Sequence, residues 1–351
     1  MNFGVSRADG AITFSTFDDY LIIWNVPSEK CAALSKTNLL KRYGILVNSG
    51  HKFLGEVIVV FYEEKFGLLP YYHNYSDPKS AVNGGIPQRA NISAHLSVVR
   101  NNISKQIPDA NFSGLAVIDY EKWRPLWDLH NYYKLKIYQN ESIAHVKTRN
   151  NGISESNAKK IAMDEFNNAS VNFLLETIRE AKKLRPNATW GFYGMPFCNY
   201  SAGKSGYAGC GTVYEKFNDR LEHLYKEVDA LFPSIYIPHR GSNVTSCLYV
   251  GSVLTEAGRC AKKVKPEIPT YPYVGFEYFP INLTNPFYTR RDLRNSLGQA
   301  FYVGAKGSII WSTSKNMTER CISIAQYVED SLGPEIANLP NLTSAKTAKP
   351  L

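Results

Sequence analysis

The chain has 351 residues, 44% of them apolar and 20% charged, and carries a formal net charge of +9. This length fits one large domain or two ordinary ones, and the apolar content excludes a disordered chain. The sequence contains no run of eighteen apolar residues, so we expect no membrane span. A basic protein suits acidic partners, among which are acidic polysaccharides, nucleic acid and membrane surfaces.

Short apolar runs bounded by turn residues recur along the chain, with helical patterns between them. Such runs indicate buried strands, and their alternation with helices indicates an α/β fold with parallel pairing. The predicted strands are Tyr20–Asn25, Val57–Tyr62, Leu115–Asp119, Gly191–Met195, Ser234–Pro238, Tyr271–Gly275 and Ser308–Trp311. Seven strands are one fewer than the usual barrel has.

The clearest helical pattern runs from Glu155 to Leu184, where apolar residues at three- and four-residue spacings form one stripe. Ser154 is a suitable N-cap, and Arg185-Pro186 is a suitable end. Phe66–Ala90 is rich in Gly, Pro, Tyr and Asn, which is typical of a long loop that shapes a groove. Further helices are predicted at Val213–Leu231 with Thr212 as cap, at Arg290–Ala305, and at Cys321–Leu332 before Gly333-Pro334.

The third predicted strand ends in two acidic residues, Asp119 and Glu121. Side chains two apart in an extended chain point the same way, and active sites of parallel folds lie at the carboxyl ends of strands. Repulsion between two close carboxylates and a flanking apolar wall raise the pKa, so one carboxyl can act as a general acid. We predict Glu121 as that acid and Asp119 as its partner. The competing interpretation is that the strand simply ends in two solvated carboxylates that have no catalytic role.

The residues after this acid pair narrow the substrate class. Trp123 and Arg124 place an aromatic ring and a fixed cation beside two acids, which suits a sugar-acid substrate. Arg124 is equally suited to a salt bridge that keeps Asp119 ionised. Ordinary glycosidases place their two carboxyls on opposite sides of the scissile bond, whereas these two leave one strand in one direction. This favours substrate-assisted hydrolysis, in which the 2-acetamido oxygen of the sugar attacks its own C1.

Twelve Asn-x-Ser/Thr sequons are present, where chance predicts roughly 3 to 4. The excess of sequons and the six cysteines suggest a glycosylated protein of an oxidising compartment, either secreted or lysosomal. A protein in such a compartment is not expected to bind nucleic acid. The N-terminal twenty residues nevertheless lack the apolar core of a signal peptide. The glycosylation candidates are Asn74, Asn91, Asn102, Asn111, Asn140, Asn243, Asn282 and Asn316. The remaining sequons are at Asn168, Asn187, Asn199 and Asn341.

No Cys-x-x-Cys pair and no His-Glu-x-x-His motif is present, so we expect neither a metal site nor a cofactor. If residues 247–260 form one helix, Cys247 and Cys260 lie about 20 Å apart by helical rise and cannot bond to each other. A broken helix would leave that pairing open.

The segment IDYEKWRP, Ile118–Pro125, resembles the active-site segment of the hyaluronidase family, the bee-venom and mammalian endo-β-N-acetylhexosaminidases. Other segments match in the same order, from about Tyr20 to Ile336. They are WNVPSEKC, RYGIL, NGGIPQ, WGFYGMPFC, LFPSIYIP, GSIIWSTS and SLGPEI. The resemblance implies a seven-stranded (β/α) TIM-like barrel, a single catalytic domain over residues 1–340 with a loosely ordered tail over 341–351, and hydrolysis of hyaluronan.

The resemblance also implies disulfides and roles for individual residues. Cys31 would pair with Cys321, and Cys198 with Cys210. Tyr193 would orient the acetamido carbonyl, Tyr236 would contact the acid and the substrate, and Trp311 would form the floor of a sugar subsite. Tyr62, Thr313 and Ser314 are further candidates for substrate binding. Lys315 stands where the venom type has an acid, and Gly275–Phe279 does not match the family pattern.

The leading hypothesis is therefore a monomeric endo-hydrolase that cuts the β-1,4 bond after N-acetylglucosamine in hyaluronan. A hydrolase that prefers chondroitin is the nearest competing hypothesis, because its N-acetylgalactosamine differs at one hydroxyl. Two further hypotheses are an inactive homologue that only binds glycan and a lytic eliminase.

Overall fold

The computed structural model describes residues 20–131, 133–204, 206–237, 243–279, 281 and 287–339, with two short strands, β1 (Arg7–Ala8) and β2 (Ala11–Ile12). The chain forms two compact units. We call Met1–Val60, Asn111–Val117 and Gly191–Leu351 the first unit, and Phe61–Ala110 and Ile118–Trp190 the second unit. The predicted tail over residues 341–351 lies outside the described residues.

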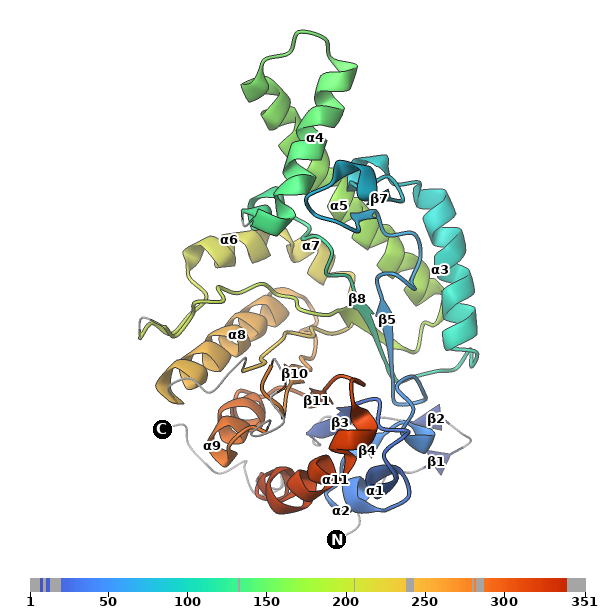
Figure 1. The fold of residues 1–351 in the computed structure, drawn as a ribbon, viewed down its shortest axis with the longest axis vertical. Coiled ribbons are helices and arrows are strands. Elements are labelled where there is room, and N and C mark those ends of the chain that lie inside the picture. Colours follow the sequence, from blue (N-terminus) through green and yellow to red (C-terminus); the bar gives the residue numbers. More distant parts are fainter. Residues whose placement is uncertain are drawn as a thin grey trace. The chain divides into compact units, whose positions relative to one another are not determined.

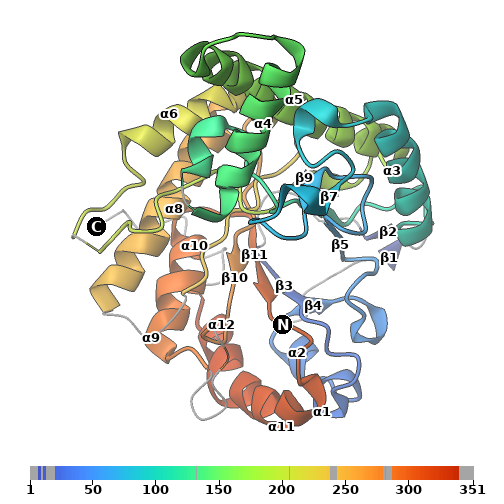
Figure 2. The same ribbon diagram turned by 45° about the horizontal axis from the view of Figure 1, so that its top comes forward.

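The first unit contains a parallel sheet with the strand order β10-β11-β3-β4. Figure 2 shows these four strands side by side. Their side chains are mostly buried, as the unbroken apolar runs predict. The strands are β3 (Leu21–Asn25), β4 (Leu46–Val47), β10 (Tyr273–Val274) and β11 (Gly307–Trp311).

The predicted strand Ser234–Pro238 is wrong as a continuous strand. In its place, parallel bridges join Leu231 to Thr270, Phe232 to Tyr193 and Ser234 to Tyr273. The backbone here still has extended neighbours, since Ile235 N–H donates to Tyr273 O at 3.0 Å. Pro233 has no N–H to donate, which explains why the ladder is interrupted.

A second sheet has the order β5-β8-β9, and the boundary between the two units runs through its strands. Gly191 of β9 is required by a close approach, because a Cβ there would lie 2.3 Å from the carbonyl oxygen of Ala230. The strands are β5 (Ile58–Tyr62), β8 (Leu115–Asp119) and β9 (Thr189–Phe192). The bounds of β5 and β8 are close to those predicted, whereas β9 begins and ends earlier than the predicted Gly191–Met195.

The side chain of Asn48 connects the chain after β4 to β5 inside the first unit. Its Oδ1 accepts the N–H groups of Val57 and Ile58 at 2.9 and 3.1 Å, and its Nδ2 donates to Ile58 O at 2.9 Å. A buried amide thereby replaces the main-chain ladder that the two-residue strand β4 does not continue.

One predicted helix of the first unit is shorter and interrupted in the structure. The run expected over Val213–Leu231 is two helices that end at Tyr225, and Gly211 rather than Thr212 occupies the N-cap position. The helices are α1 (Ala32–Ser35), α2 (Leu39–Arg42), α6 (Thr212–Arg220), α7 (Glu222–Tyr225), α8 (Asn243–Lys263), α9 (Arg290–Leu293), α10 (Gln299–Tyr302), α11 (Met317–Tyr327) and α12 (Gly333–Ala337). A 3₁₀ turn, η1 (Ser49–His51), follows β4.

Two of the predicted helices contain π turns, η6 (Arg294–Gly298) and η7 (Val328–Leu332). Gly333-Pro334 was predicted to stop the last helix, and this is wrong. Gly333 has helical dihedrals, and Pro334 lies in the first turn of α12, where its missing N–H has no partner to lose.

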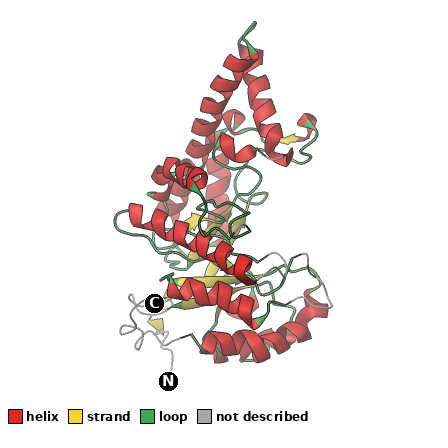
Figure 3. Cartoon of the chain, turned by 90° about the vertical axis from the view of Figure 1, so that its left-hand side faces the viewer, coloured by secondary structure: helices red, strands yellow, loops and turns green. Residues whose placement is uncertain are grey.

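The second unit is mainly helical (Figures 1 and 3). Its long helix α5 (Glu155–Leu184) has the predicted bounds, and the Ser154 hydroxyl caps it by accepting Asn157 N–H. The region Phe66–Ala90, which was predicted as a long loop, contains an antiparallel pair of short strands. The other elements are β6 (Tyr71–Tyr72), β7 (Ala81–Val82), α3 (Ile92–Gln106), α4 (Lys136–Arg149), and the 3₁₀ turns η2 (Pro78–Ser80), η3 (Pro87–Arg89), η4 (Trp127–His130) and η5 (Tyr133–Leu135).

Aromatic rings form much of each core. In the first unit Trp24 stacks on Phe276 at 5.3 Å between ring centroids. In the second unit Phe61 contacts Phe66 at 4.4 Å and Trp190 at 5.6 Å. Each such ring buries on the order of 150–250 Å², so these clusters supply a large share of the apolar burial. No helix among the described residues has the length and apolarity needed to span a bilayer.

Candidate active site

The acid pair lies in the second unit, at the end of β8. The residues between and after the acids anchor the segment: Tyr120 and Trp123 are buried, and they donate hydrogen bonds to Phe66 O and Pro70 O, each at 2.8 Å. Because the aromatic side chains point into the core, the backbone of Asp119 and Glu121 is held in a defined position.

The environment of Asp119 favours its neutral form. Loss of water, followed by repulsion from Glu121 and Glu63, raises the pKa of Asp119 to about 8, while the Arg124 cation opposes this. Asp119 Oδ1 is buried, and no hydrogen-bond partner for it is found among the described residues. Glu121 and Glu63 therefore both act electrostatically on Asp119.

Glu121 is the more accessible acid, with 49% of its side chain exposed. Its pKa is nevertheless raised, mainly because the surrounding protein removes water; the Arg124 guanidinium, 3.8 Å from Glu121 Oε1, acts in the opposite direction and the charge of Glu63 adds to the rise. Arg124 therefore lowers the pKa of both acids, but its ion pair is with Glu121, and it does not keep Asp119 ionised, since the pKa of Asp119 is still raised to about 8.

A third acid, Glu63, was missed by the sequence reasoning. It follows Tyr62 at the end of β5, and its N–H donates to Asp119 O at 3.1 Å. Its carboxylate accepts the N–H of Glu121 at 2.6 Å. Parallel strands end at one edge of a sheet, so an acid after β5 could have been placed beside an acid after β8.

Lys122 holds this acidic group together from the side. Its ammonium lies 3.5 Å from Glu63 and 2.7 Å from Glu64, and 5.0 Å from the centroid of the Tyr71 ring. Tyr62, a predicted substrate contact, ends β5 and is half-buried in the same unit.

The predicted aromatic residues lie in the first unit and contact one another. Tyr236 lies between Tyr193 and Trp311, with ring centroids 6.5 and 6.0 Å away. The Tyr193 hydroxyl donates to Ser234 Oγ at 3.2 Å. Thr313 is half-buried and Ser314 exposed, directly after β11. Tyr193, Tyr236 and Trp311 are each half-buried, so part of this ring cluster is accessible.

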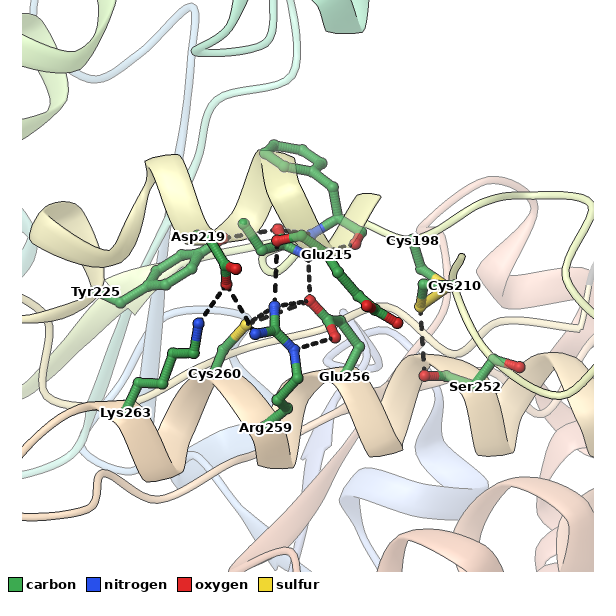
Figure 4. Close-up of polar contacts among 12 residues, drawn as sticks. Cys198, Cys210, Glu215, Asp219, Tyr225, Ser252, Glu256, Arg259, Cys260 and Lys263 are labelled. Carbon is green, nitrogen blue, oxygen red and sulfur yellow. Dashed lines mark hydrogen bonds and ion pairs between the residues drawn. A yellow bond between two sulfur atoms is a disulfide. The ribbon is translucent and has the colours of Figure 1, made fainter. Parts of the chain in front are cut away.

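The segment after Tyr193 is held by a polar network on α6 and α8 (Figure 4). The Asn218 side chain pairs with both backbone groups of Phe197, and it donates to the buried Glu256 at 2.7 Å. Glu256 also accepts from Arg259, at 2.7 Å from both Nε and Nη2. The network and the Cys198–Cys210 disulfide fix the loop that follows β9.

Both predicted disulfides are present, Cys31–Cys321 and Cys198–Cys210. Cys247 and Cys260 are free and lie on the single helix α8, so the alternative of a broken helix, which left their pairing open, is wrong. Burial raises the pKa of the Cys260 thiol, so this cysteine is unreactive. The described residues contain no cluster of His, Cys, Asp or Glu that could hold a metal ion.

The predicted glycosylation sites differ in accessibility. Asn102 is half-buried, and its side-chain oxygen accepts Gly67 N–H. Asn282 and the side chain of Asn243 lie outside the described residues. The exposed candidates are Asn74, Asn91, Asn111, Asn140 and Asn316.

Comparison with known proteins defines the class of this molecule. Its fold matches that of bee venom hyaluronidase, with a TM-score of 0.83 and 31% identity over 91% of this chain and 100% of that one. The match to the bee venom enzyme in complex with a hyaluronic acid tetramer has a TM-score of 0.84, 31% identity and coverage of 92% and 99%. The chain is thus a glycoside hydrolase with the predicted α/β barrel fold.

Sequence comparison gives the family. The hyaluronidase family model, glycoside hydrolase family 56, matches residues 12–348, and the chain belongs to this family. Chondroitin hydrolase of Caenorhabditis elegans is 37% identical over 318 residues, 89% of this chain and 68% of that protein. Hyaluronidase-1 of Sus scrofa is 35% identical over 336 residues, with coverage of 91% and 74%.

Proposed function

We propose that this protein is an endo-glycosidase that hydrolyses the β-1,4 bonds between N-acetylglucosamine and glucuronate in hyaluronan. The observation that carries the proposal is the acid pair at the end of β8, where the pKa of Asp119 rises to about 8 beside a half-exposed Glu121. Membership of the hyaluronidase family supports the substrate class.

The proposed mechanism is substrate-assisted and retains the anomeric configuration. Glu121 protonates the leaving glycosidic oxygen while the acetamido oxygen of the substrate attacks C1, and the C1–O bond breaks. In the second step Glu121 removes a proton from water, which attacks C1 and opens the cyclic intermediate. Asp119 accepts the acetamido N–H and stabilises the positive charge that develops on that group.

The electrostatics of the acid pair suit a proton shift on substrate binding. In the free protein Asp119 holds a proton near neutral pH, since its pKa is about 8. A substrate N–H that donates to Asp119 favours the ionised form of Asp119. The negative charge on Asp119 then raises the pKa of Glu121 further, so that Glu121 becomes the proton donor.

The remaining predicted residues receive roles in substrate binding. Tyr193 orients the acetamido carbonyl, Tyr236 contacts the substrate, and Trp311 stacks on a sugar ring. Arg124 pairs with a glucuronate carboxylate. Tyr62, Thr313 and Ser314 hydrogen-bond to sugar hydroxyls.

A preference for chondroitin is the second candidate function. The relative that is named a chondroitin hydrolase is 37% identical to this chain, which favours this candidate. Digestion of purified hyaluronan and of unsulfated chondroitin under the same conditions, followed by mass analysis of the fragments, separates the two candidates. Products without the absorbance of an unsaturated uronate exclude an eliminase.

We also propose that the protein acts outside the cytosol, as a secreted or lysosomal monomer with N-linked glycans. The support is the two disulfides and the exposed sequons. Cleavage by an endoglycosidase tests for the N-linked glycans. Size-exclusion chromatography with light scattering tests for the monomer.

Exchange of the proposed acid tests the mechanism. Glu121→Gln should reduce kcat by roughly 10² to 10⁴-fold, because a positioned general acid contributes about that much. Binding of the polymer should be retained, since the amide keeps the size of the side chain. Turnover is measured by loss of hyaluronan turbidity, and binding by co-sedimentation.

The matched control is Glu64→Gln, which changes an exposed acid of the same unit. It should leave turnover close to that of the wild type. Unchanged turnover in Glu121→Gln would refute the assignment, and a wild-type protein that binds polymer but never cuts it would identify an inactive homologue.

A further inference from the structure

A buried ion pair in the first unit joins Glu277, which lies after β10, to Arg320 of α11. The side chains are 0% and 3% exposed. Arg320 Nη1 donates to both carboxylate oxygens, at 2.7 and 2.6 Å. The buried Ser312 hydroxyl donates to the same carboxylate.

The same guanidinium binds the backbone of the chain that follows β11. We call Trp311–Lys315 the Trp311 segment. Arg320 Nη2 donates to Thr313 O at 2.6 Å, and Nε donates to Lys315 O at 2.9 Å. A lysine could not make these contacts together, because its ammonium is a single point of charge and the guanidinium is a planar fork of five N–H groups.

Glu277 also lies close in sequence to a second ring that contacts Trp311. Phe279, two residues after Glu277, lies 6.0 Å from Trp311 between ring centroids, with 31° between the planes. Arg320 precedes Cys321, whose disulfide to Cys31 fixes the position of α11. The Trp311 segment and the segment that carries Phe279 are thus joined through one buried ion pair.

We propose that Glu277 and Arg320 are positioning residues that hold the Trp311 segment in the geometry needed to bind a sugar ring. The inference rests on the proposed function, and it adds two residues to which the sequence reasoning assigned no role. Neither side chain is accessible to substrate, so each acts through Trp311, Thr313 and Ser314.

The chemistry of the ion pair explains why its loss should weaken substrate binding. Replacing a buried ion pair by well-packed apolar residues is often neutral for stability, so stability alone does not require such a pair. What apolar residues cannot replace is the set of hydrogen bonds to the carbonyl oxygens of Thr313 and Lys315. Loss of those bonds frees the Trp311 segment and leaves the acid pair unchanged.

The test uses the full chain with Arg320→Lys and, as a second variant, Glu277→Gln. Either variant should raise KM for hyaluronan about tenfold, comparable to loss of one good polar contact, with kcat within about twofold of the wild type. In a Glu121→Gln background, the Kd for hyaluronan oligosaccharides should rise by the same factor. This second measurement needs no turnover.

Tryptophan fluorescence provides a readout of position in the absence of substrate. Of the five tryptophans, Trp311 is half-buried, whereas the other four are at most 4% exposed. Quenching by acrylamide therefore reports mainly on Trp311, and Arg320→Lys should increase it.

The matched control is Arg294→Lys, which breaks another bidentate pair of the first unit, with Glu335 at 2.8 and 2.9 Å. It should alter neither KM nor quenching. If Arg320→Lys and Glu277→Gln lower the melting temperature but leave KM, Kd and quenching unchanged, the pair only stabilises the fold and the inference is overturned. A wild-type protein that fails to cut either polymer overturns the proposed function, while the quenching result still decides the inference.

Discussion

Glu63 influences the acid pair through its charge, from a strand other than the one that carries the pair. It contacts the chain at both acids, because its own N–H donates to Asp119 O and its carboxylate accepts Glu121 N–H. Its negative charge raises the pKa of both Asp119 and Glu121. Three carboxyls around one strand end therefore determine over which pH range a single proton stays on the pair.

Glu63→Gln should move the pH–rate profile of the enzyme to lower pH. The amide oxygen can still accept Glu121 N–H, but the negative charge is lost, so both acids release their protons more readily. The alkaline limb of kcat/KM, where the general acid loses its proton, should shift to lower pH, and the acid limb should shift in the same direction. A profile measured between pH 3 and pH 9 in constant ionic strength checks this.

Glu64→Gln serves as the control for that profile, since Glu64 contacts Lys122 but does not contribute to the raised pKa of either acid. A profile that moves to higher pH in Glu63→Gln, or moves equally in both variants, would contradict the electrostatic role of Glu63.

At the scale of residues, the sequence predicted neighbours that lie on one strand. It missed neighbours that come from two separate elements. The spacing of Asp119 and Glu121 follows from the two-residue period of an extended chain. Glu63 joins them only because β5 lies beside β8 in the sheet, and Arg320 is 43 positions along the chain from Glu277. Such contacts depend on tertiary packing, and no local sequence pattern predicts them.

At the scale of elements, the turn after β8 holds the acid segment through a neutral histidine. His130 is 0% exposed, and its Nε2 accepts Arg124 N–H at 3.1 Å. Only an unprotonated Nε2 can accept this bond, and burial lowers the pKa of His130 to about 3. The turn η4 is therefore formed around an uncharged ring next to Arg124.

This histidine should make the fold less stable in acid. In the unfolded chain a histidine takes up a proton below about pH 6.5, but in the folded chain His130 does so only near pH 3. Between these values the unfolded state binds more protons, so stability falls as the pH falls. From pH 7 to pH 4.5 the loss from this one group is on the order of 2–3 kcal/mol.

Urea denaturation of the wild type and of His130→Asn at pH 7 and pH 4.5 checks this. The variant should lose less stability between the two pH values, even if it is less stable overall. Asp119, whose pKa is raised, acts in the opposite direction, but it is common to both proteins and cancels in the comparison. His223→Asn, which changes an exposed histidine, is the control. Equal pH dependence in wild type and His130→Asn would contradict the assignment.

The elements also show where helix signals fail. The N-cap and length of α5 were predicted correctly because a strong stripe, a capping serine and a proline agree. Gly333-Pro334 looks like a stop, yet Leu332 and Gly333 keep helical dihedrals and the helix continues from the π turn into α12. The predicted helix over Val213–Leu231 ended early because the last part of this run, Leu231, is needed for the bridge to Thr270.

At the scale of the whole molecule, the two disulfides constrain very different lengths of chain. Cys31–Cys321 spans 290 residues, and Cys198–Cys210 spans 12. The first joins the N-terminal turn of α1 to α11, so it connects the beginning of the described chain to its end within the first unit. The pairing came from the resemblance to a family, since six cysteines allow many pairings that spacing alone does not separate.

Removal of the long-range disulfide should therefore be the more costly change. In the chain-entropy model, loss of a cross-link that closes a 290-residue loop destabilises the fold by about 6 kcal/mol, against about 3 kcal/mol for the 12-residue loop. The double variants Cys31→Ala/Cys321→Ala and Cys198→Ala/Cys210→Ala are compared by guanidinium denaturation at neutral pH. A larger loss from the short loop would contradict the entropic account and would show that the loop after β9 contributes more to folding than the junction of α1 and α11. The double variant that lacks Cys31–Cys321 should also raise KM for the polymer, because that disulfide fixes the helix whose Arg320 holds the Trp311 segment.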